Sequence, residues 1–330
     1  MAGSIKDSKH GSVQQKMPCL YQTVVIEEES SKRSWQPYRV VASENIRQAA
    51  LDSNISSATG SEKFDGTCVY VHEFHEKPWL WARHDSKPNK AADKRFKKFQ
   101  ASHRSWMLHG KPEAEPTFKW NIDKDFKEIP KDWIPAEGVR VLNGRAQPDD
   151  NGHIPGWVPI DPTLRTHLWH LSVVDLEKGL CITLQSKDDH FEITFKWLSD
   201  FLGQTLELIG TNVNANPYGL GSKEKPIHVL VPHGAIGFSI PPPQDYSTLK
   251  EWFVNDPEGQ VEGVVWLCTN GNMFKVHRHH LDLKWPIEKL CFNNTRVLIS
   301  TKFEDEDYEK PLFTLLKGLN GYVVDSVQNI

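Results

Sequence analysis

The segment Thr67-Cys-Val-Tyr-Val-His-Glu-Phe74 is rich in β-branched and aromatic residues, a composition that predicts a β-strand. A turn at His75-Glu-Lys-Pro78 follows it, and then a second strand-forming run, Trp79-Leu-Trp-Ala-Arg83. Together the three segments predict a β-hairpin. An ordered strand is therefore expected to begin directly after the short sequence Lys63-Phe64-Asp65-Gly66.

A third strand is predicted further along the chain. Ser199 is a candidate N-cap for a short helix, and Thr205-Leu-Glu-Leu-Ile209 then predicts a strand that ends at Gly210. A polar loop, 211–221, follows the strand. Glu207 lies between two leucines, so its carboxylate faces away from both; by itself, such a glutamate is typical of a solvated strand face.

A helix and a second β-hairpin are predicted next. Ser247 is a candidate cap for the helix, which ends before Pro257. Strands are predicted at Val261–Cys268 and Met273–Arg278, and Thr269-Asn-Gly-Asn272 joins them. Asn-Gly between two β-rich runs is the strongest short hairpin signal.

The pairing within this hairpin predicts which side chains share a face. Closure of the hairpin places Trp266 opposite Lys275, and Glu262 and His277 then share the face of Lys275. About 13 Å along the strand separates Glu262 from Lys275, a span that two long side chains can bridge with a metal ion and a phosphate between them. The alternative is that these charged residues lie on a solvent-exposed face.

Composition excludes several classes of protein. The 330 residues include 39 Lys and Arg against 43 Asp and Glu, so a globally basic surface is excluded and any polyanion must meet a local basic patch. No run approaches the roughly 18 apolar residues of a membrane helix, and residues 1–16 contain no apolar signal-peptide core. Five scattered cysteines indicate reduced thiols in an intracellular protein, cytoplasmic or nuclear.

The remaining regions carry weaker patterns. Residues 1–16 predict a flexible tail, and residues from about 86 to 194, rich in Pro and Gly without a clean period, predict an elaborated insertion packed on the core. From about 285 onward we expect a short extension with an acidic run at Glu304–Glu309 and a helix near Pro311–Lys317.

Local basic charge is concentrated between Arg83 and Arg104, where eight Lys or Arg occur against two Asp. The spacing of Phe96 and Phe99 predicts a helix that buries both rings and exposes Lys94, Arg95, Lys97 and Lys98. This basic face is either an ordinary solvated surface or a patch for the phosphates of a polynucleotide.

Lys63 is the first candidate for covalent chemistry. A lysine amine is a nucleophile only when neutral, and its usual pKa of about 10.4 keeps it protonated unless burial, a cation or a metal lowers that pKa. Gly66 leaves room for a phosphate to approach the backbone. Alone the K-x-D-G pattern is weak, because most lysines before a turn are solvated.

Taken in order, five sites resemble the motif series of the covalent nucleotidyltransferases, the family of ATP-dependent polynucleotide ligases and mRNA-capping guanylyltransferases. They are Lys63-Phe-Asp65-Gly66, Arg83, Glu207-Leu-Ile-Gly210, Glu262-Gly-Val-Val265 and Lys275. More closely, the chain resembles the animal ligases that join RNA 5′-phosphate and 3′-hydroxyl ends. That likeness lies in Trp81–Arg83, Asn151–Val158, Leu206–Asn212, Asn216–Lys223 and Lys275–Leu281, and it is poor after Pro286.

The resemblance implies a role for each residue. Lys63 would attack the α-phosphate of ATP and carry AMP as a phosphoramidate. Arg83 and Glu207 would hold the nucleotide, Glu207 at the ribose. Glu262 would help to hold a divalent ion, Mg²⁺ or Mn²⁺, and Lys275 would neutralise charge at the α-phosphate.

Three further positions follow from the same resemblance. Asp65 would orient the lysine loop. His277 stands where many members of the superfamily have a second lysine, and whether it reaches a phosphate stays open. His233 and Phe238 are both candidates for stacking on the adenine, and the sequence does not separate them.

The expected fold is α+β: a nucleotidyltransferase domain over 17–330, with antiparallel sheets flanked by helices and the insertion at 86–194. No C-terminal OB barrel is expected, because the 55 residues after Lys275 are fewer than the roughly 70 that five strands need. The implied function is ATP-dependent joining of RNA 5′-phosphate and 3′-hydroxyl ends through lysyl-AMP and adenylylated RNA, in RNA repair, by a monomer without membrane contact. The alternatives are a DNA ligase or capping-type enzyme, which shares the motifs, and a non-catalytic RNA-binding module on the same fold.

Overall fold

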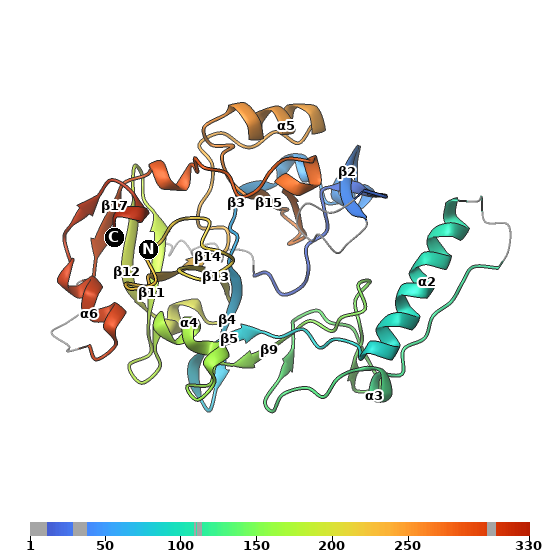
Figure 1. The fold of residues 1–330 in the computed structure, drawn as a ribbon, viewed down its shortest axis with the longest axis horizontal. Coiled ribbons are helices and arrows are strands. Elements are labelled where there is room, and N and C mark those ends of the chain that lie inside the picture. The colour runs from blue at the N-terminus through green and yellow to red at the C-terminus, as the bar shows by residue number, and fades with distance from the viewer. Residues whose placement is uncertain (1–11, 29–37, 109, 111–113, 302–307) are drawn as a thin grey trace, which may run out of the picture. The chain divides into compact units, whose positions relative to one another are not determined.

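The computed structural model describes residues 12–28, 38–108, 110, 114–301 and 308–330. Residues 1–11 of the predicted tail and most of the predicted acidic run therefore lie outside the described residues. The chain divides into two compact units (Figure 1). Of the described residues, the first unit contains those up to Val13, those of Met17–Leu80 and those of Ile160–Ile330. The second unit contains Gln14–Lys16 and the described residues of Trp81–Pro159.

A large mixed sheet forms one part of the first unit. Its strands lie in the order β18 (Val323–Val324), β17 (Val297–Ser300), β12 (Phe191–Trp197), β11 (Leu180–Ser186), β14 (His228–Pro232), β13 (Thr205–Gly210), β4 (Thr67–Phe74) and β5 (Lys77–Arg83). β10 (Val174–Asp175) pairs with β11. The pairs β11–β12, β13–β14 and β4–β13 are antiparallel as expected, whereas β11–β14 and β12–β17 are parallel, so the expected antiparallel arrangement holds only in part.

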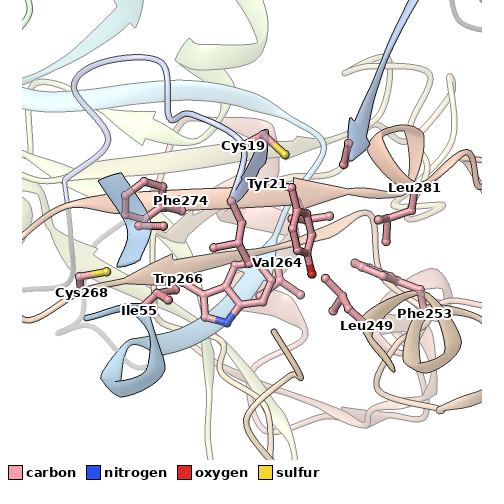
Figure 2. Packing of buried hydrophobic residues seen from close by; sticks show 14 of the residues in the cluster. Cys19, Tyr21, Ile55, Leu249, Phe253, Val264, Trp266, Cys268, Phe274 and Leu281 are labelled. Atoms are coloured by element: carbon pink, nitrogen blue, oxygen red, sulfur yellow. The ribbon is translucent and has the colours of Figure 1, made fainter. Parts of the chain in front are cut away.

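A smaller antiparallel sheet of the first unit carries the candidate lysine. β15 (Gly263–Leu267) lies between β3 (Thr59–Lys63) and β16 (Met273–His277). Val264 and Trp266 of β15 are buried against Leu249 and Phe253 of helix α5, as Figure 2 shows. Because side chains alternate along a strand, the opposite face of this sheet is left for Lys63 and its neighbours.

The predicted hairpin exists, but its register differs by one residue from the expected one. Val265, rather than Trp266, lies opposite Lys275. The connecting loop is longer than expected, because the Cys268 N–H donates to the Asn272 carbonyl and the strand ends at Leu267. A shift of one residue moves Trp266 into the apolar cluster and away from the face of Lys275.

The predicted helices occur with adjusted ends. α5 (Tyr246–Asn255) is capped by Asp245, whose carboxylate accepts a hydrogen bond from the Thr248 N–H, and not by Ser247. Ser199 lies inside a single 3-10 turn, η3 (Leu198–Phe201). The C-terminal helix α6 (Pro311–Gly318) is confirmed.

Shorter elements complete the first unit. β1 (Tyr21–Ile26) pairs with β2 (Arg39–Ile46). The short helices are α1 (Gln48–Asp52) and α4 (Leu168–Ser172), with 3-10 turns η1 (Ile55–Ser57), η2 (Arg165–His167), η4 (Arg278–Leu281), η5 (Phe292–Asn294) and η6 (Val327–Asn329). No helix among the described residues combines the length and the apolar character needed to cross a membrane.

The second unit is built around helix α2. Its elements are α2 (Lys90–Leu108), α3 (Ile122–Asp125), β6 (Ile134–Pro135), β7 (Val141–Leu142), β8 (Arg145–Ala146) and β9 (Gly156–Pro159), which pairs with the end of β5. The Asn89 side chain caps α2 by accepting hydrogen bonds from two backbone N–H groups. Phe96 is buried as the spacing predicted, against Phe118 and Trp120, whereas Phe99 is only half-buried.

Two predicted boundaries differ from the structure. The second unit ends at Pro159, whereas residues 160–194 contribute β11 and part of β12 to the first unit. At the other end, Gln14 belonged to the predicted tail, yet its side chain is buried and accepts a hydrogen bond from Trp157 Nε1 at 2.9 Å.

Candidate functional site

Lys63 forms a shielded ion pair with Glu262. Lys63 is the last residue of β3 and lies opposite Gly263 of β15, so the preceding residue, Glu262, is brought beside it. Lys63 Nζ is 2.6 Å from Glu262 Oε2, and the two side chains are 20% and 5% exposed. Attraction between such a pair is stronger than between exposed charges, because little solvent screens it.

The charges around Lys63 hold its amine in the protonated form. Burial lowers the pKa of Lys63, but the carboxylates of Glu262, Glu207 and Asp65 outweigh burial, so the pKa lies above its usual value. The ammonium has no lone pair for attack. Loss of this proton near neutral pH therefore requires a change in the charges around Lys63.

A second buried carboxylate lies next to the lysine in sequence. Burial and the charge of Glu262 raise the pKa of Glu62 to about 8, so Glu62 is mostly neutral at pH 7. Glu62 and Lys63 both line the same cavity. The site thus contains more carboxyl groups than cationic groups to pair with them.

The loop after Lys63 is held by hydrogen bonds to Asp65. The Asp65 carboxylate accepts from Trp285 Nε1 at 2.7 Å and from Asn214 Nδ2 at 2.9 Å. Its backbone N–H donates to the hydroxyl oxygen of the fully buried Tyr218 at 2.7 Å. Sequence reasoning did not identify these three partners of Asp65, although Tyr218 lies in a segment that carried the family likeness.

Gly66 is required by the close approach of β13. A Cβ at this position would lie 2.3 Å from the carbonyl oxygen of Leu208 and 2.8 Å from Glu207 Cγ. The Gly66 N–H also donates to Glu207 Oε1 at 3.1 Å. The space beside Gly66 is therefore filled by protein, which differs from the expectation that it admits a phosphate.

Glu207 faces the site and is not a solvated strand residue. Glu207 Oε2 is 2.9 Å from His233 Nε2, and His233 Nδ1 is 2.8 Å from Thr205 Oγ1. His233 lines the cavity, whereas Phe238 packs against Trp252 of α5. Of the two candidates for adenine stacking, the structure places His233 at the site.

A small cavity connects these groups. Its volume is about 90 Å³, and its polar lining includes Ser61, Glu62, Lys63, Cys68, Glu207 and His233. Val13 and Met17 contribute apolar lining from the N-terminal segment. Ligand pockets usually measure roughly 300–1,000 Å³, so this cavity is smaller than a usual ligand pocket.

Lys275 and His277 differ in what they can supply. Lys275 lies opposite Val265, a residue of the cavity lining, and so shares its face of the sheet. His277 stacks on His280 at 3.6 Å between ring centroids. Burial, then the neighbouring His280 and Lys63, hold the pKa of His277 far below its usual value. His277 is therefore neutral and does not replace the charge of a second lysine.

Arg83 belongs to the second unit, and its contacts there are well defined. Its guanidinium donates to the Asp85 carboxylate at 2.6 Å and to the Gln14 carbonyl at 2.6 Å. It also stacks over the ring of Trp157 at 4.8 Å. The structure brings Lys63, Glu207 and Glu262 together within the first unit, and Arg83 is fixed by its own neighbours in the second.

Comparison with known proteins shows which family this chain resembles in sequence. The model of the RNA ligase 1 family matches residues 7–330. Relatives named RNA ligase 1 include those of Danio rerio, 46% identical over 97% of this chain and 98% of that protein, and of Pongo abelii, 49% identical over 88% and 87%. The relative from Rattus norvegicus is 48% identical over 90% of each chain. The similarity thus continues past Pro286, where the motifs carried little likeness.

Proposed function

This chain belongs to the RNA ligase 1 family and is an RNA ligase, and from that premise we propose that it joins RNA 5′-phosphate and 3′-hydroxyl ends with ATP through a lysyl-AMP intermediate. The observation that carries the proposal is the 2.6 Å ion pair between Lys63 Nζ and Glu262 at the edge of a cavity. A nucleophile with a proton acceptor in contact is the arrangement that covalent catalysis needs.

The proposed reaction has three phosphoryl-transfer steps. Lys63 Nζ attacks the α-phosphorus of ATP; a P–N bond forms, the bond to the β-phosphate oxygen breaks, and pyrophosphate and the lysine proton leave. An oxygen of the RNA 5′-phosphate then attacks the same phosphorus, which frees Lys63. Finally the 3′-hydroxyl attacks the 5′-phosphorus, AMP leaves, and the hydroxyl proton is lost.

The carboxylates around Lys63 fit a divalent ion with oxygen ligands. The carboxylates of Glu262, Glu207 and Asp65 outweigh burial and raise the pKa of Lys63, and Glu262 offers the hard oxygen donors that Mg²⁺ prefers. When bound, Mg²⁺ or Mn²⁺ would offset carboxylate charge and polarise the phosphates. Contact of the ion with Glu262 would weaken the hold of this carboxylate on the lysine proton, which would then be lost to solvent.

We assign the side chains near Lys63 to the parts of the nucleotide that they would contact. We assign Glu207 to the ribose and His233 to the base, because both line the cavity of Lys63. Lys275 is assigned to the α-phosphate as the cation on the same sheet face, and Arg83 to the nucleotide on the family pattern alone. His277, which is neutral, is left without a charge-neutralising role.

Intact mass after incubation with ATP and Mg²⁺ tests the first step. Wild-type protein should gain the mass of one AMP, and Lys63→Ala should gain none. Lys289→Ala removes an exposed lysine outside the site and should behave as wild type. AMP still bound covalently to Lys63→Ala would contradict the assignment of the nucleophile.

Choice of nucleotide and of strand separates this proposal from its rivals. Labelling by GTP in preference to ATP would indicate capping chemistry, and sealing of nicked DNA in preference to RNA ends would indicate a DNA ligase. We expect the protein to use ATP rather than GTP and to join RNA ends rather than DNA ends. We expect it to act as a monomer, as in the repair of broken RNA strands. RNA joining that persists in Lys63→Ala would overturn the whole mechanism.

A further inference from the structure

Three side chains with metal-binding atoms converge on one wall of the cavity. Cys68 of β4 and Glu207 of β13 are cross-strand partners, and Val231 of β14 is the partner of Glu207 on the other side. His233 follows Val231 by two residues. The Cys68 sulfur, a Glu207 carboxylate oxygen and a His233 ring nitrogen all lie within 4.8 Å of one another.

This donor set is that of zinc rather than of magnesium. Zn²⁺ takes thiolate, imidazole and carboxylate ligands at about 2.0–2.3 Å, which puts tetrahedral ligand atoms roughly 3.3–3.8 Å apart. His233 Nε2 and Glu207 Oε2 are already 2.9 Å apart, so small side-chain rotations suffice to admit the ion. A thiolate selects against the hard ions Mg²⁺ and Ca²⁺.

Neighbouring groups already orient two of the three ligands. The Gly66 N–H holds Glu207 Oε1, which leaves Oε2 on the side of His233. Thr205 Oγ1 holds His233 Nδ1 at 2.8 Å. A hydroxyl both donates and accepts, so Thr205 can receive an Nδ1 proton when Nε2 binds a metal.

From this geometry we propose that Cys68, Glu207 and His233 form an inhibitory site for Zn²⁺, with the fourth coordination position open to the cavity. Binding displaces the Cys68 thiol proton to solvent and forms a zinc–thiolate bond, so affinity rises with pH. Cys68, Glu207, His233 and Lys63 all line the same cavity of about 90 Å³. The exclusion of nucleotide by zinc rests on the proposed function, whereas zinc binding itself does not.

Direct metal binding is tested without nucleotide. The full chain competes with a chromophoric chelator for Zn²⁺, and Co²⁺ serves as a spectroscopic substitute. Wild type should bind one ion, with thiolate-to-Co²⁺ charge-transfer absorption. Cys68→Ser should lose that absorption and at least about tenfold in zinc affinity. Cys291→Ser, a half-buried cysteine outside the cluster, is the matched control and should retain both.

Absence of the charge-transfer band in wild type, or equal zinc affinity in wild type and Cys68→Ser, overturns the site. Circular dichroism confirms that each variant is folded before it is compared. A His233→Gln variant gives a second reading, since loss of the imidazole should weaken zinc binding even if the serine retains a weak ligand.

Competition with ATP tests the inhibitory part. Zn²⁺ should slow lysyl-AMP formation in Mg²⁺, rising ATP should relieve the inhibition, and Cys68→Ser should resist zinc relative to its own zinc-free rate. Inhibition that ATP does not relieve overturns the exclusion of nucleotide. If no lysyl-AMP forms under any condition while zinc binding depends on Cys68, the proposed function fails and the zinc site stands.

Discussion

Lys63 is an amine whose reactivity is set by the carboxylates around it. Many catalytic lysines carry a lowered pKa, but here Glu262, Glu207 and Asp65 outweigh burial and raise it. The ammonium form of Lys63 is therefore favoured. In the proposed reaction, cationic charge that arrives with the substrates would weaken the hold of these carboxylates on the ammonium, which would couple activation to substrate binding.

Glu62 should make stability depend on pH. Burial, with the charge of Glu262, raises its pKa from 4.5 to about 8, so between these values the folded chain binds a proton that the unfolded chain does not. The free energy of unfolding therefore falls as pH rises through this window, by up to about 1.4 kcal/mol per pH unit. Glu62→Gln removes the titration. Urea unfolding at both ends of the window should show wild type losing stability relative to this variant as pH rises.

Parallel stability profiles for wild type and Glu62→Gln would contradict the raised pKa. Glu309→Gln is a suitable control, because that side chain is exposed to solvent and its substitution should leave the profile unchanged. The prediction depends only on folding, so it is independent of any nucleotide chemistry.

At the scale of elements, the turn between β3 and β4 is positioned by the loop after β13. Tyr218→Phe removes the acceptor of the Asp65 N–H and leaves a buried donor unpaired, a cost of about 1–3 kcal/mol. We expect the rate of lysyl-AMP formation at saturating ATP to fall about tenfold, because a displaced nucleophile reacts slowly, while KM for ATP changes little.

Tyr322→Phe is the matched control, since Tyr322 is 61% exposed and lies outside the site. Its rate and melting temperature should equal those of wild type. If Tyr218→Phe lowers the melting temperature but reacts at the wild-type rate while folded, Tyr218 is only structural.

Helix α2 exposes the basic face that the sequence predicted. Lys94, Lys97 and Lys98 are exposed, and Lys97 pairs with Asp93 at 2.8 Å. Neutralising the three lysines to Gln should weaken RNA binding and lower the slope of log affinity against log salt by about 0.7 for each RNA phosphate that the variant no longer neutralises. Fluorescence anisotropy over a salt series measures both quantities.

A triple variant elsewhere controls for net charge. Lys77, Lys284 and Lys289 are exposed outside α2, and changing them to Gln should leave the salt slope unchanged. Equal slopes of log affinity against log salt for wild type and the α2 variant would mean that the lysines of α2 are solvated and do not contact RNA. Lysyl-AMP formation without RNA should be the same in all three proteins.

Local sequence signals predicted elements well where the pattern was short and strong. The hairpin of β4 and β5 and helix α6 are confirmed, although β5 begins at Lys77, two residues before the predicted start. Turn residues and a capping Pro act locally, which is why these elements could be predicted. The register of β15 and β16 was wrong by one residue, since loop closure at Cys268 depends on geometry that Asn-Gly alone does not fix. Asp245 was missed as a cap because Ser247 offers the same chemistry two residues later.

At the scale of the molecule, sequence patterns did not predict strands that are buried on both faces. β11, with the sequence Leu-Cys-Ile-Thr-Leu over 180–184, is fully buried along that run and shows no alternation of apolar and polar residues. This segment was therefore assigned to an insertion. The partners of Asp65 were also out of reach, because Asn214 and Trp285 approach it through tertiary structure alone.

The C-terminal segment is part of the first unit rather than an appendage. β17 pairs in parallel with β12, and the ring of Phe292 lies 5.4 Å from that of Phe64, the residue after the lysine. Phe292 also contacts Phe191 and Tyr218, so one ring links the C-terminal segment to the lysine loop. Removal of the Phe292 ring should therefore affect the geometry of the lysine loop as well as the stability of the protein.

Phe292→Ala should cost about 3–5 kcal/mol of unfolding free energy, as removal of a buried ring usually does. Phe313→Ala removes an equally buried ring of α6 and should cost a similar amount. The two variants differ in what surrounds the deleted ring, because Phe313 packs on Phe195 and Tyr308 rather than on the lysine loop. At a temperature where both remain folded, only Phe292→Ala should slow lysyl-AMP formation. Equal rates in the two variants would mean that the C-terminal segment contributes stability without positioning Lys63.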